Sequence, residues 1–255
     1  MRRYTDRTVM ITGAGQGLGR AMALRFAAEG ARLALCDVNE TSVQETAARC
    51  GDGGIRPDGD VRTSVVDVAD APQVDAWVAG TLETFGRVDV LVNNAGVIRD
   101  NRLERMTDDE WDAVVDVSLR GMFHCCRAAF PHMKAQGYGR ILSFSSMSWR
   151  GNFGQVNYAA AKAGVVGMAR TIALEGAPHG VTSNAIAPGL IDTPMLASMN
   201  AAGRAKLAAR VPLGHIGDPT DIAEAAAYLC SEAAGYVTGV VLDVDGGIGI
   251  GGAPR

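Results

Sequence analysis

A hydroxyl, a phenol and an amine within one short stretch are the groups of this chain best suited to chemistry. Tyr158 and Lys162 are four residues apart, so on a helix they lie on one face, one turn from each other. An ammonium beside a phenol lowers the phenol pKa, which is normally about 10. Ser145, followed by Ser146, lies upstream at the expected end of a strand. We predict that Tyr158 is a general acid/base, that Lys162 tunes its pKa, and that Ser145 binds a carbonyl oxygen. Alone, the Tyr–Lys spacing also fits a solvated surface pair.

Strand-like and helix-like segments alternate along the chain that must position these groups. Short apolar runs predict strands over 8–12, 31–38, 61–68, 88–96, 139–146, 181–188 and 237–247. Capping residues and glycine stops predict helices over 41–49, 70–85, 107–130, 157–174 and 218–230, and one that ends at Gly30. Pro131 is expected to kink the helix over 107–130 or to restart it. This alternation predicts an α/β fold: one doubly wound parallel sheet of about seven strands, with helices on both faces and a single domain over 1–255.

The composition narrows the possible classes of protein. The 255 residues carry a net charge of −4, with 20% charged and 47% hydrophobic residues. Such a chain has no basic cluster for nucleic acid or an anionic membrane, and charges interrupt its apolar runs, so no membrane segment is expected. Five cysteines without a CxxC pair and four scattered histidines predict reduced thiols and no metal site. With no secretory signal at the start, we expect a cytoplasmic protein.

A glycine cluster follows the first predicted strand. Gly13, Gly17 and Gly19 have the spacing G-x-x-x-G-x-G, which lets the backbone approach a pyrophosphate at a helix N-terminus. Asp37 ends the second strand, eighteen residues beyond Gly19, where a carboxylate accepts hydrogen bonds from a ribose diol and repels a 2′-phosphate. Position 16 is Gln16 rather than a basic residue, so NAD(H) is favoured over NADP(H). A plain strand–helix turn and a helix-capping role for Asp37 remain alternatives.

Taken together, these motifs resemble the short-chain dehydrogenase/reductase family. The resemblance rests on Thr12–Gly19, Asn93–Gly96, Ser145 thirteen residues before Tyr158, Lys162, and Pro188-Gly189, and it covers nearly the whole chain. It implies a Rossmann-type fold with Tyr158 as proton donor and acceptor, Ser145 as the carbonyl-orienting hydroxyl and Lys162 as the ribose-binding base. It also implies that Asp67 and Val68 hold the adenine ring, and that Pro188-Gly189 and Thr193 contact the nicotinamide.

The expected contacts can be grouped by ligand. The predicted cofactor contacts are Gly13, Gln16, Gly17, Leu18, Gly19, Asp37, Val38, Asp67, Val68, Asn94, Ala95, Gly96, Tyr158, Lys162, Pro188, Gly189, Ile191 and Thr193. The predicted substrate contacts are Ser145, Met147, Trp149, Phe153, Tyr158, Leu190 and Met195. A Met- and Leu-containing segment over 190–212 is expected to cover the substrate, unless it forms a fixed helical hairpin.

One position departs from the family pattern. Where the family usually places a catalytic asparagine, this chain has Ser118, between Val117 and Leu119. A single hydroxyl cannot reproduce both functions of a carboxamide. Either only the backbone at 118 is needed, through a water that reaches Lys162, or the protein is inactive. We keep Ser118 as the fourth candidate catalytic residue.

The resemblance implies reversible hydride transfer between NAD(H) and a secondary alcohol or ketone. Asn93–Asn101 and Val211–Gly217 resemble the 3-oxoacyl-acyl-carrier-protein reductases, a branch that is typically homotetrameric. That activity is one alternative, and a non-catalytic cofactor-binding regulator is another. An acidic carrier needs basic residues beside the site, but Lys134 is the only fixed positive charge in 131–134 and 177–180. We therefore expect a small free ketone or alcohol as substrate.

Overall fold

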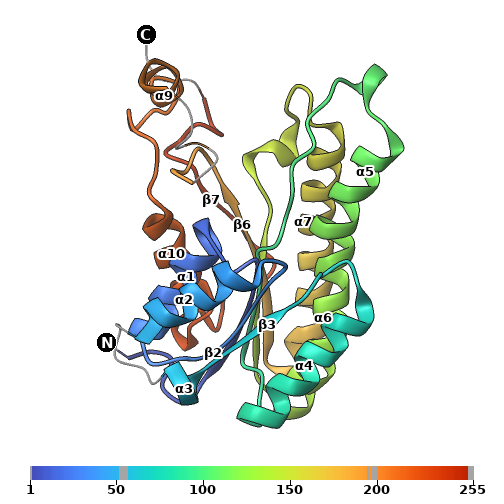
Figure 1. Ribbon diagram of the computed structural model, residues 1–255, viewed down its shortest axis with the longest axis vertical. Coiled ribbons are helices and arrows are strands. Elements are labelled where there is room, and N and C mark those ends of the chain that lie inside the picture. The colour runs from blue at the N-terminus through green and yellow to red at the C-terminus, as the bar shows by residue number, and fades with distance from the viewer. Residues whose placement is uncertain (1, 52–56, 194–195, 197–199, 252–255) are drawn as a thin grey trace.

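Seven parallel strands form one sheet through the molecule (Figure 1). The computed structural model describes residues 2–51, 57–193, 196 and 200–251. The strands are β1 (Thr8–Thr12), β2 (Arg32–Asp37), β3 (Val61–Val65), β4 (Val90–Asn93), β5 (Gly139–Phe144), β6 (Val181–Pro188) and β7 (Val241–Val244). Their order in the sheet is β3-β2-β1-β4-β5-β6-β7, which confirms the predicted doubly wound parallel fold. Because every strand in the described part of the chain belongs to this sheet, we propose that residues 1–255 are one domain.

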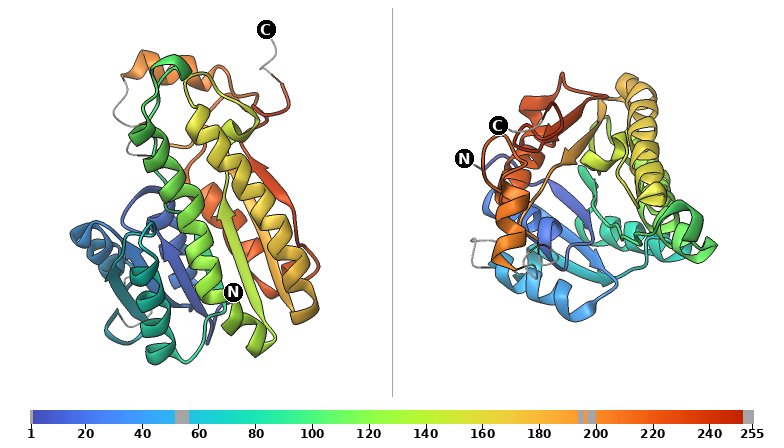
Figure 2. Two further views of the ribbon diagram at one scale, coloured as in Figure 1. Left: turned by 90° about the vertical axis from the view of Figure 1, so that its right-hand side faces the viewer. Right: turned by 90° about the horizontal axis from the view of Figure 1, so that it is seen from above.

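Helices cover both faces of the sheet, as Figures 1 and 2 show. One face carries α1 (Gly17–Ala28), α2 (Glu40–Gly51) and α10 (Pro219–Leu229). The opposite face carries α4 (Ala71–Phe85), α6 (Gly121–Gln136) and α7 (Val156–Gly176). Two short helices, α3 (Pro57–Asp60) and α9 (Ala201–Ala208), lie in the connections. Among the described residues, no helix has both the length and the apolar character needed to cross a membrane.

The alternation of side chains along each strand builds two cores. Val9 and Ile11 of β1 pack with Phe26 under α1, whereas Met10, between them in sequence, packs on the opposite face with Trp77 of α4. All five residues of β1 are buried, as expected for a strand covered on both faces. The helix layers thus hold the sheet rigidly and leave its carboxyl edge for loops.

The helix predicted over 107–130 differs in the structure. It consists of α5 (Asp108–Val115), a single π-helical turn (Asp116–Arg120) and α6. The Thr107 capping box is present, but α6 runs through Pro131 to Gln136 instead of stopping there. The π turn contains Ser118, and such turns occur frequently at functional sites. The alternative in which the helix restarts at Pro131 was therefore wrong, and the interruption of the α-helical pattern is the π turn upstream.

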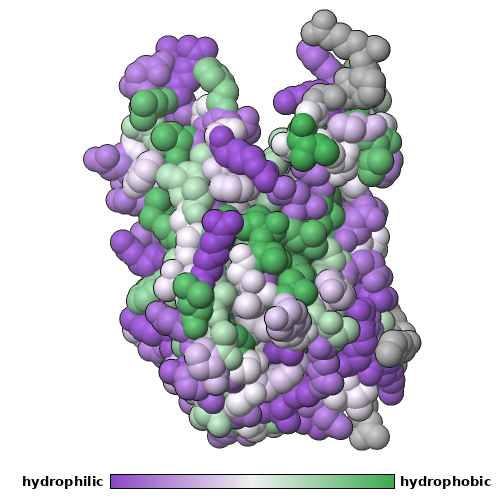
Figure 3. Space-filling view, turned by 180° about the vertical axis from the view of Figure 1, so that it is seen from behind, coloured by the Kyte–Doolittle hydropathy of each residue, from purple (hydrophilic) through white to green (hydrophobic). Residues whose placement is uncertain are grey.

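Two projections rise above the carboxyl edge of the sheet. The region of α5 stands on one side and α9 on the other (Figure 1). Seen from behind, the surface between them is hollowed and has apolar residues at its base (Figure 3). Strands β4, β5 and β6 all end toward this hollow. The loops that follow them therefore come together there, which is where an open α/β sheet binds its ligands.

Candidate active site

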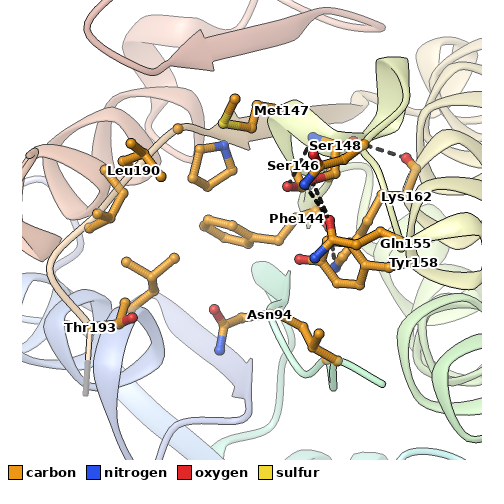
Figure 4. Close-up of a pocket in the computed structure, with 18 of the residues that line it drawn as sticks. Asn94, Phe144, Ser146, Met147, Ser148, Gln155, Tyr158, Lys162, Leu190 and Thr193 are labelled. Atoms are coloured by element: carbon orange, nitrogen blue, oxygen red, sulfur yellow. Dashed lines mark hydrogen bonds between the residues drawn. The ribbon is translucent and has the colours of Figure 1, made fainter. Parts of the chain in front are cut away.

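A cavity of about 400 Å³ lies at the carboxyl edge, where the predicted catalytic residues meet the predicted cofactor contacts. Tyr158 and Lys162 reach it from α7, and Ser146 reaches it from the end of β5 (Figure 4). Ser145 also lines the cavity. Seven predicted cofactor contacts also line it: Leu18, Asn94, Gly96, Pro188, Gly189, Ile191 and Thr193. The fold thus brings together groups that are more than a hundred residues apart in the sequence.

The Tyr158–Lys162 pair lies on one face of α7, but its electrostatics differ from the prediction. The Lys162 Nζ atom lies 5.4 Å from the centre of the Tyr158 ring and donates a hydrogen bond to the Phe144 carbonyl at 2.7 Å. Burial raises the pKa of Tyr158, although a hydrogen bond with the Ser146 side chain opposes this effect. Burial also lowers the pKa of Lys162 to about 8. The predicted lowering of the phenol pKa by Lys162 is therefore absent from this state, in which desolvation dominates.

The two adjacent serines have different surroundings. Ser145 is 3% exposed, and its hydroxyl donates to the backbone carbonyl of Lys162 at 2.9 Å. Ser146 is partly exposed, lines the cavity and hydrogen-bonds to Tyr158. The prediction placed Ser145 against a carbonyl oxygen of the substrate. The structure instead uses the Ser145 hydroxyl to anchor β5 to α7, and it leaves Ser146 facing Tyr158 (Figure 4).

The glycine loop packs too closely to admit side chains. A Cβ atom on Gly19 would lie 2.1 Å from the Gly13 carbonyl oxygen, and Gly13 itself has a φ of 62°, which L-residues rarely adopt. Asn94 holds the loop, because its Nδ2 atom donates to the carbonyls of Thr12 and Gly13, both at 3.0 Å. Gln16 caps α1 without a side-chain hydrogen bond. The first amides of α1 therefore remain available, and the cradle suits a pyrophosphate.

Asp37 lies against this loop at the end of β2. Its Oδ2 atom accepts a hydrogen bond from the Gly15 amide at 2.9 Å, and Oδ1 accepts from the Asn39 amide at 3.0 Å. The neighbouring Arg20 turns away, since its guanidinium binds the Gly15 carbonyl and the Thr46 hydroxyl. The carboxylate is therefore the charged group on the loop side of β2, and Val38 beside it is 67% exposed.

Comparisons with known proteins agree with this geometry. A family model described as enoyl-(acyl carrier protein) reductase matches residues 13–249. The chain belongs to the short-chain dehydrogenase/reductase family. The short-chain reductase protein NovJ of Streptomyces niveus is 45% identical over 249 residues, or 95% of this chain and 94% of NovJ. The 3-oxoacyl-(acyl-carrier-protein) reductase FabG of Thermotoga maritima is 40% identical over 247 residues, which cover 96% of this chain and 99% of FabG. A crystal structure of levodione reductase matches with a TM-score of 0.93 at 41% identity, covering 97% of this chain and 99% of that one.

Membership of this family makes the protein an oxidoreductase, and the family uses nicotinamide cofactors. Such a cofactor fits along the carboxyl edge of the sheet. The glycine loop suits its pyrophosphate, Asp37 a ribose, and the cavity beside Tyr158 the nicotinamide. Asp67 is exposed and its Oδ1 atom accepts from the Ala69 amide at 2.9 Å. The Val68 side chain, by contrast, packs under Gly121, and its carbonyl contacts His124 Nδ1 at 3.0 Å. The predicted adenine contact at Val68 stays a prediction, and it would fall to the Val68 backbone because the side chain belongs to the core.

Ser118 takes the place of the family's asparagine and is almost completely buried. Its side chain is 3% exposed, and its Oγ atom has no hydrogen-bond partner among the described residues. A Cβ atom on Gly96 would lie 3.4 Å from both Ser118 Oγ and Lys162 Nζ. The hydroxyl and the ammonium therefore border the same small space behind the cavity.

The predicted substrate contacts divide between two places. Met147 and Leu190 line the cavity with Tyr158. Trp149 and Phe153 instead line a separate groove of about 690 Å³ with Arg102 and Arg150, and Phe153 is 83% exposed. They do not share the cavity with Tyr158, because the loop before α7 turns them to its outer side, and their contact with a substrate stays a prediction. Met195 lies outside the described residues.

Sequence reasoning missed the polar wall of the cavity. Ser148, Asn152 and Gln155 line it and hydrogen-bond to one another through the Gln155 Oε1 atom. Apolar contacts from Val97 and Ile98 were missed as well, whereas Leu196 belongs to the segment that was expected to cover the substrate. The only signal in the sequence was the proximity of 148–155 to Tyr158, which says nothing about the side on which each residue lies.

The charge argument against a carrier protein was also misplaced. Residues 131–134 and 177–180 precede the starts of β5 and β6, so they lie at the amino edge of the sheet, opposite the cavity. Beside the cavity, Arg99, Arg102 and Arg150 are exposed. In the groove, the guanidinium of Arg102 stacks over Phe153 at 5.6 Å and that of Arg150 over Trp149 at 4.7 Å. The small number of basic residues in 131–134 and 177–180 therefore carries no information about a carrier.

Proposed function

We propose that this protein interconverts a secondary alcohol and a ketone with NAD(H), and that Tyr158 is the general acid/base. One observation carries the proposal: a single cavity holds Tyr158 and Ser146 on one side and the predicted nicotinamide contacts Pro188, Gly189 and Thr193 on the other. A ketone in this space would have its oxygen beside two hydroxyl groups. The bound nicotinamide would supply or accept the hydride.

In the reductive direction Tyr158 donates a proton to the developing alkoxide. Its raised pKa keeps the phenol protonated at neutral pH, which suits a general acid. Ser146 donates a second hydrogen bond to the same oxygen, and this bond strengthens as charge develops. We assign this role to Ser146 and not to Ser145, since Ser145 is occupied by the Lys162 carbonyl.

Lys162 supplies positive charge beneath the phenol. With a pKa near 8, its ammonium is mostly protonated at neutral pH. Among the described residues, only the Phe144 carbonyl accepts a hydrogen bond from it. The cation stabilises the phenolate that remains after proton transfer, and it can reach a cofactor ribose with its remaining donors. We propose that the Lys162 ammonium lowers the pKa of Tyr158 only when the cofactor is bound, because the cofactor then excludes water from the pair.

The preference for NAD(H) rests on Asp37. A ribose diol can donate to this carboxylate, whereas a 2′-phosphate at the same place would meet a fixed negative charge. Arg20, the neighbouring cation, is engaged with Gly15 and Thr46. The FabG relative makes this assignment worth testing directly, because reductases of that kind typically use NADPH.

The segment over 190–212 is proposed to cover the substrate. Leu190, Ile191 and Leu196 line the cavity from this side. The guanidinium of Arg204 on α9 forms a two-pronged ion pair with Asp192, at 2.8 and 2.6 Å, which ties α9 to the start of the segment. That clamp leaves the apolar side chains over the cavity, where they would exclude water from the reacting oxygen.

A second candidate substrate class is favoured by the groove beside the cavity. Its exposed Arg102 and its two aromatic rings suit an anionic acyl thioester, carried on coenzyme A or on a carrier protein, whereas Arg150 is paired with Asp243. The reaction would be the same, with a 3-ketone in the cavity.

We also propose a homotetramer, in which exposed apolar residues such as Trp111, Phe123 and Leu174 are covered by neighbouring subunits.

A substrate panel tests the function. Simple aryl and cyclic ketones and an acetoacetyl thioester are assayed with NADH and with NADPH. We expect turnover of at least one free ketone with NADH. A thioester preferred by about tenfold or more, with strong salt dependence, would favour the second candidate. Cofactor binding without turnover of any ketone would point to the regulator, and Ser118→Asn should then be tested for restored activity.

The two serines provide a matched pair of variants for the same assay. Ser146→Ala removes a donor to the reacting oxygen and should lower kcat by about 10² or more, with NADH affinity retained. Ser145→Ala removes only the bond to the Lys162 carbonyl, so it should reduce stability by about 1 kcal/mol and change kcat far less. The opposite ranking would return the role to Ser145.

A further inference from the structure

The loop that carries Ser146 has little regular structure of its own. Between β5 and α7 it contains one short 3-10 turn, Met147–Arg150, and two glycines with positive φ, Gly151 and Gly154. A loop of this composition can adopt many conformations. Side-chain hydrogen bonds therefore have to fix Ser146 relative to Tyr158.

Gln155 links this loop to the loop that follows β4. Its Nε2 atom donates to both carboxylate oxygens of Asp100, at 3.1 and 2.9 Å. Its Oε1 atom accepts from the Ser148 hydroxyl at 2.9 Å and from Asn152 Nδ2 at 2.8 Å. The backbone supports the same contact, since the Asn101 amide donates to the Gly154 carbonyl at 2.9 Å. One amide side chain thus joins the two loops.

The carboxylate sets the direction of these bonds. An ionised carboxylate only accepts hydrogen bonds, so Gln155 must turn its NH₂ group toward Asp100 and its oxygen toward Ser148. This removes the usual ambiguity in the orientation of a glutamine amide. The Ser148 hydroxyl must then donate to Gln155. Ser148 is only 6% exposed, so its position is fixed by these contacts and by packing.

The last contact reaches the cavity. The Ser148 amide donates to the Ser146 Oγ atom at 3.2 Å. Because this bond occupies a lone pair of the Ser146 oxygen, its own O–H remains free to donate toward Tyr158 and the space for the ketone (Figure 4). Asp100 itself does not line the cavity, and it reaches Ser146 only through Gln155 and Ser148.

We propose that Asp100, Gln155 and Ser148 form a bracket of positioning residues that holds Ser146 as a hydrogen-bond donor to the substrate oxygen. Asp100 is the outer anchor, Gln155 the connector and Ser148 the contact with Ser146. The inference rests on the proposed function, in which Ser146 binds the reacting oxygen. The charge of Asp100 also raises the pKa of Tyr158, which keeps the second donor to that oxygen protonated.

Four variants test the bracket. Asp100→Ala removes the anchor and Ser148→Ala removes the hydroxyl that Gln155 holds. Asp100→Asn keeps one acceptor for Gln155 without the charge. Asp75→Ala is the control, since it removes an exposed carboxylate from α4, away from the cavity. For each variant, kcat on the best ketone, the Kd for NADH and the thermal midpoint are measured, and crystal structures of the wild type and Asp100→Ala are compared.

We expect Asp100→Ala and Ser148→Ala to lower kcat by about tenfold, with the Kd for NADH within about twofold of wild type. Asp100→Asn should stay within about threefold of wild-type kcat, and Asp75→Ala should be unchanged. In the Asp100→Ala crystal structure, the bond from the Ser148 amide to Ser146 should be lost or lengthened.

Three results would overturn the bracket: wild-type kcat in Asp100→Ala and Ser148→Ala, an Asp100→Asn variant as slow as Asp100→Ala, or an unchanged Ser146 in the crystal. Loss of NADH affinity in step with kcat would count against it too, because it would indicate general distortion. If the wild type reduces no ketone, the proposed function fails. The crystal comparison then still decides whether Asp100 positions Ser146.

Discussion

The two edges of the sheet use buried polar groups in opposite ways. At the amino edge, Asp89 is completely buried, and its carboxylate accepts from the Thr8 amide at 2.9 Å, from Arg7 Nη1 at 2.9 Å and from Arg87 Nε at 2.7 Å. Arg7 also stacks on Tyr138 at 4.1 Å. Every strong hydrogen-bonding direction of this carboxylate is occupied, so the cluster joins the starts of β1 and β4 and has little capacity left for a ligand.

The carboxyl edge keeps bonding capacity in reserve. Lys162 is buried with one acceptor, the Phe144 carbonyl, and Ser118 Oγ has none among the described residues. Ser146 and Tyr158 face a cavity of about 400 Å³. Incompletely paired groups are costly to bury, so they persist where a ligand completes them. The difference between the edges indicates which charged cluster is structural and which is functional.

The largest expected effect is loss of the proton donor. Tyr158→Phe keeps the ring and its packing but removes the transferable proton. Turnover should fall by about 10² to 10⁴, the range that general acid catalysis usually contributes, while NADH binding is retained. Steady-state rates and fluorescence titration measure the two quantities. If more than about a tenth of the turnover remains, Tyr158 is not the general acid.

A substitution at the other edge should affect stability instead. Asp89→Asn replaces a buried carboxylate that two guanidiniums and an amide surround. The free energy of unfolding should fall by about 2–4 kcal/mol, less than for fully buried partners because both arginines are partly exposed. Per folded molecule, kcat should stay within about twofold of wild type. A large loss of kcat without loss of stability would break the contrast between the edges.

Lys162 should make stability depend on pH in one direction. Its pKa is about 8 in the folded state against 10.5 for the free group. Below pH 8 Lys162 is protonated in both the folded and the unfolded state, and its buried charge opposes folding. Between the two pKa values the unfolded state binds more protons than the folded state, so stability rises with pH. The free energy of unfolding is measured by denaturant for wild type and for Lys162→Met. From about pH 7 to pH 10.5, that of wild type should rise relative to that of Lys162→Met by on the order of 2 kcal/mol. A constant difference would mean that the ammonium is already well solvated.

The smallest expected effect concerns Asp37. Catalytic efficiency with NADH should exceed that with NADPH by about tenfold or more, or about 1.4 kcal/mol. Asp37→Ala should narrow the ratio, mainly through the KM for NADPH. Asp67→Ala is the matched control, because this exposed carboxylate lies farther along the same edge, on the predicted adenine side. Equal efficiency with the two cofactors in the wild type would contradict the assignment.

The features that depend on local spacing could be predicted from the sequence alone. Apolar runs that alternate with capped helices predicted the sheet and its two layers, because a buried parallel strand and an amphipathic helix each impose their own period. The glycine loop could be recognised because close approach of backbones excludes side chains, as at Gly19. Tyr158 and Lys162 could be paired because four residues make about one helical turn.

Only the folded structure shows which way a side chain points and which residues far apart in the sequence are in contact. Ser145 and Ser146 are neighbours in sequence, but adjacent residues at a strand end point to opposite sides, so their composition could not say which one faces Tyr158. Trp149 and Phe153 face outward because of the course of the loop before α7, which no local spacing records. The partner of Gln155, Asp100, is 55 residues away and emerges from a different strand. No local pattern records such a contact, because only the packing of β4 beside β5 brings the two loops within hydrogen-bond distance.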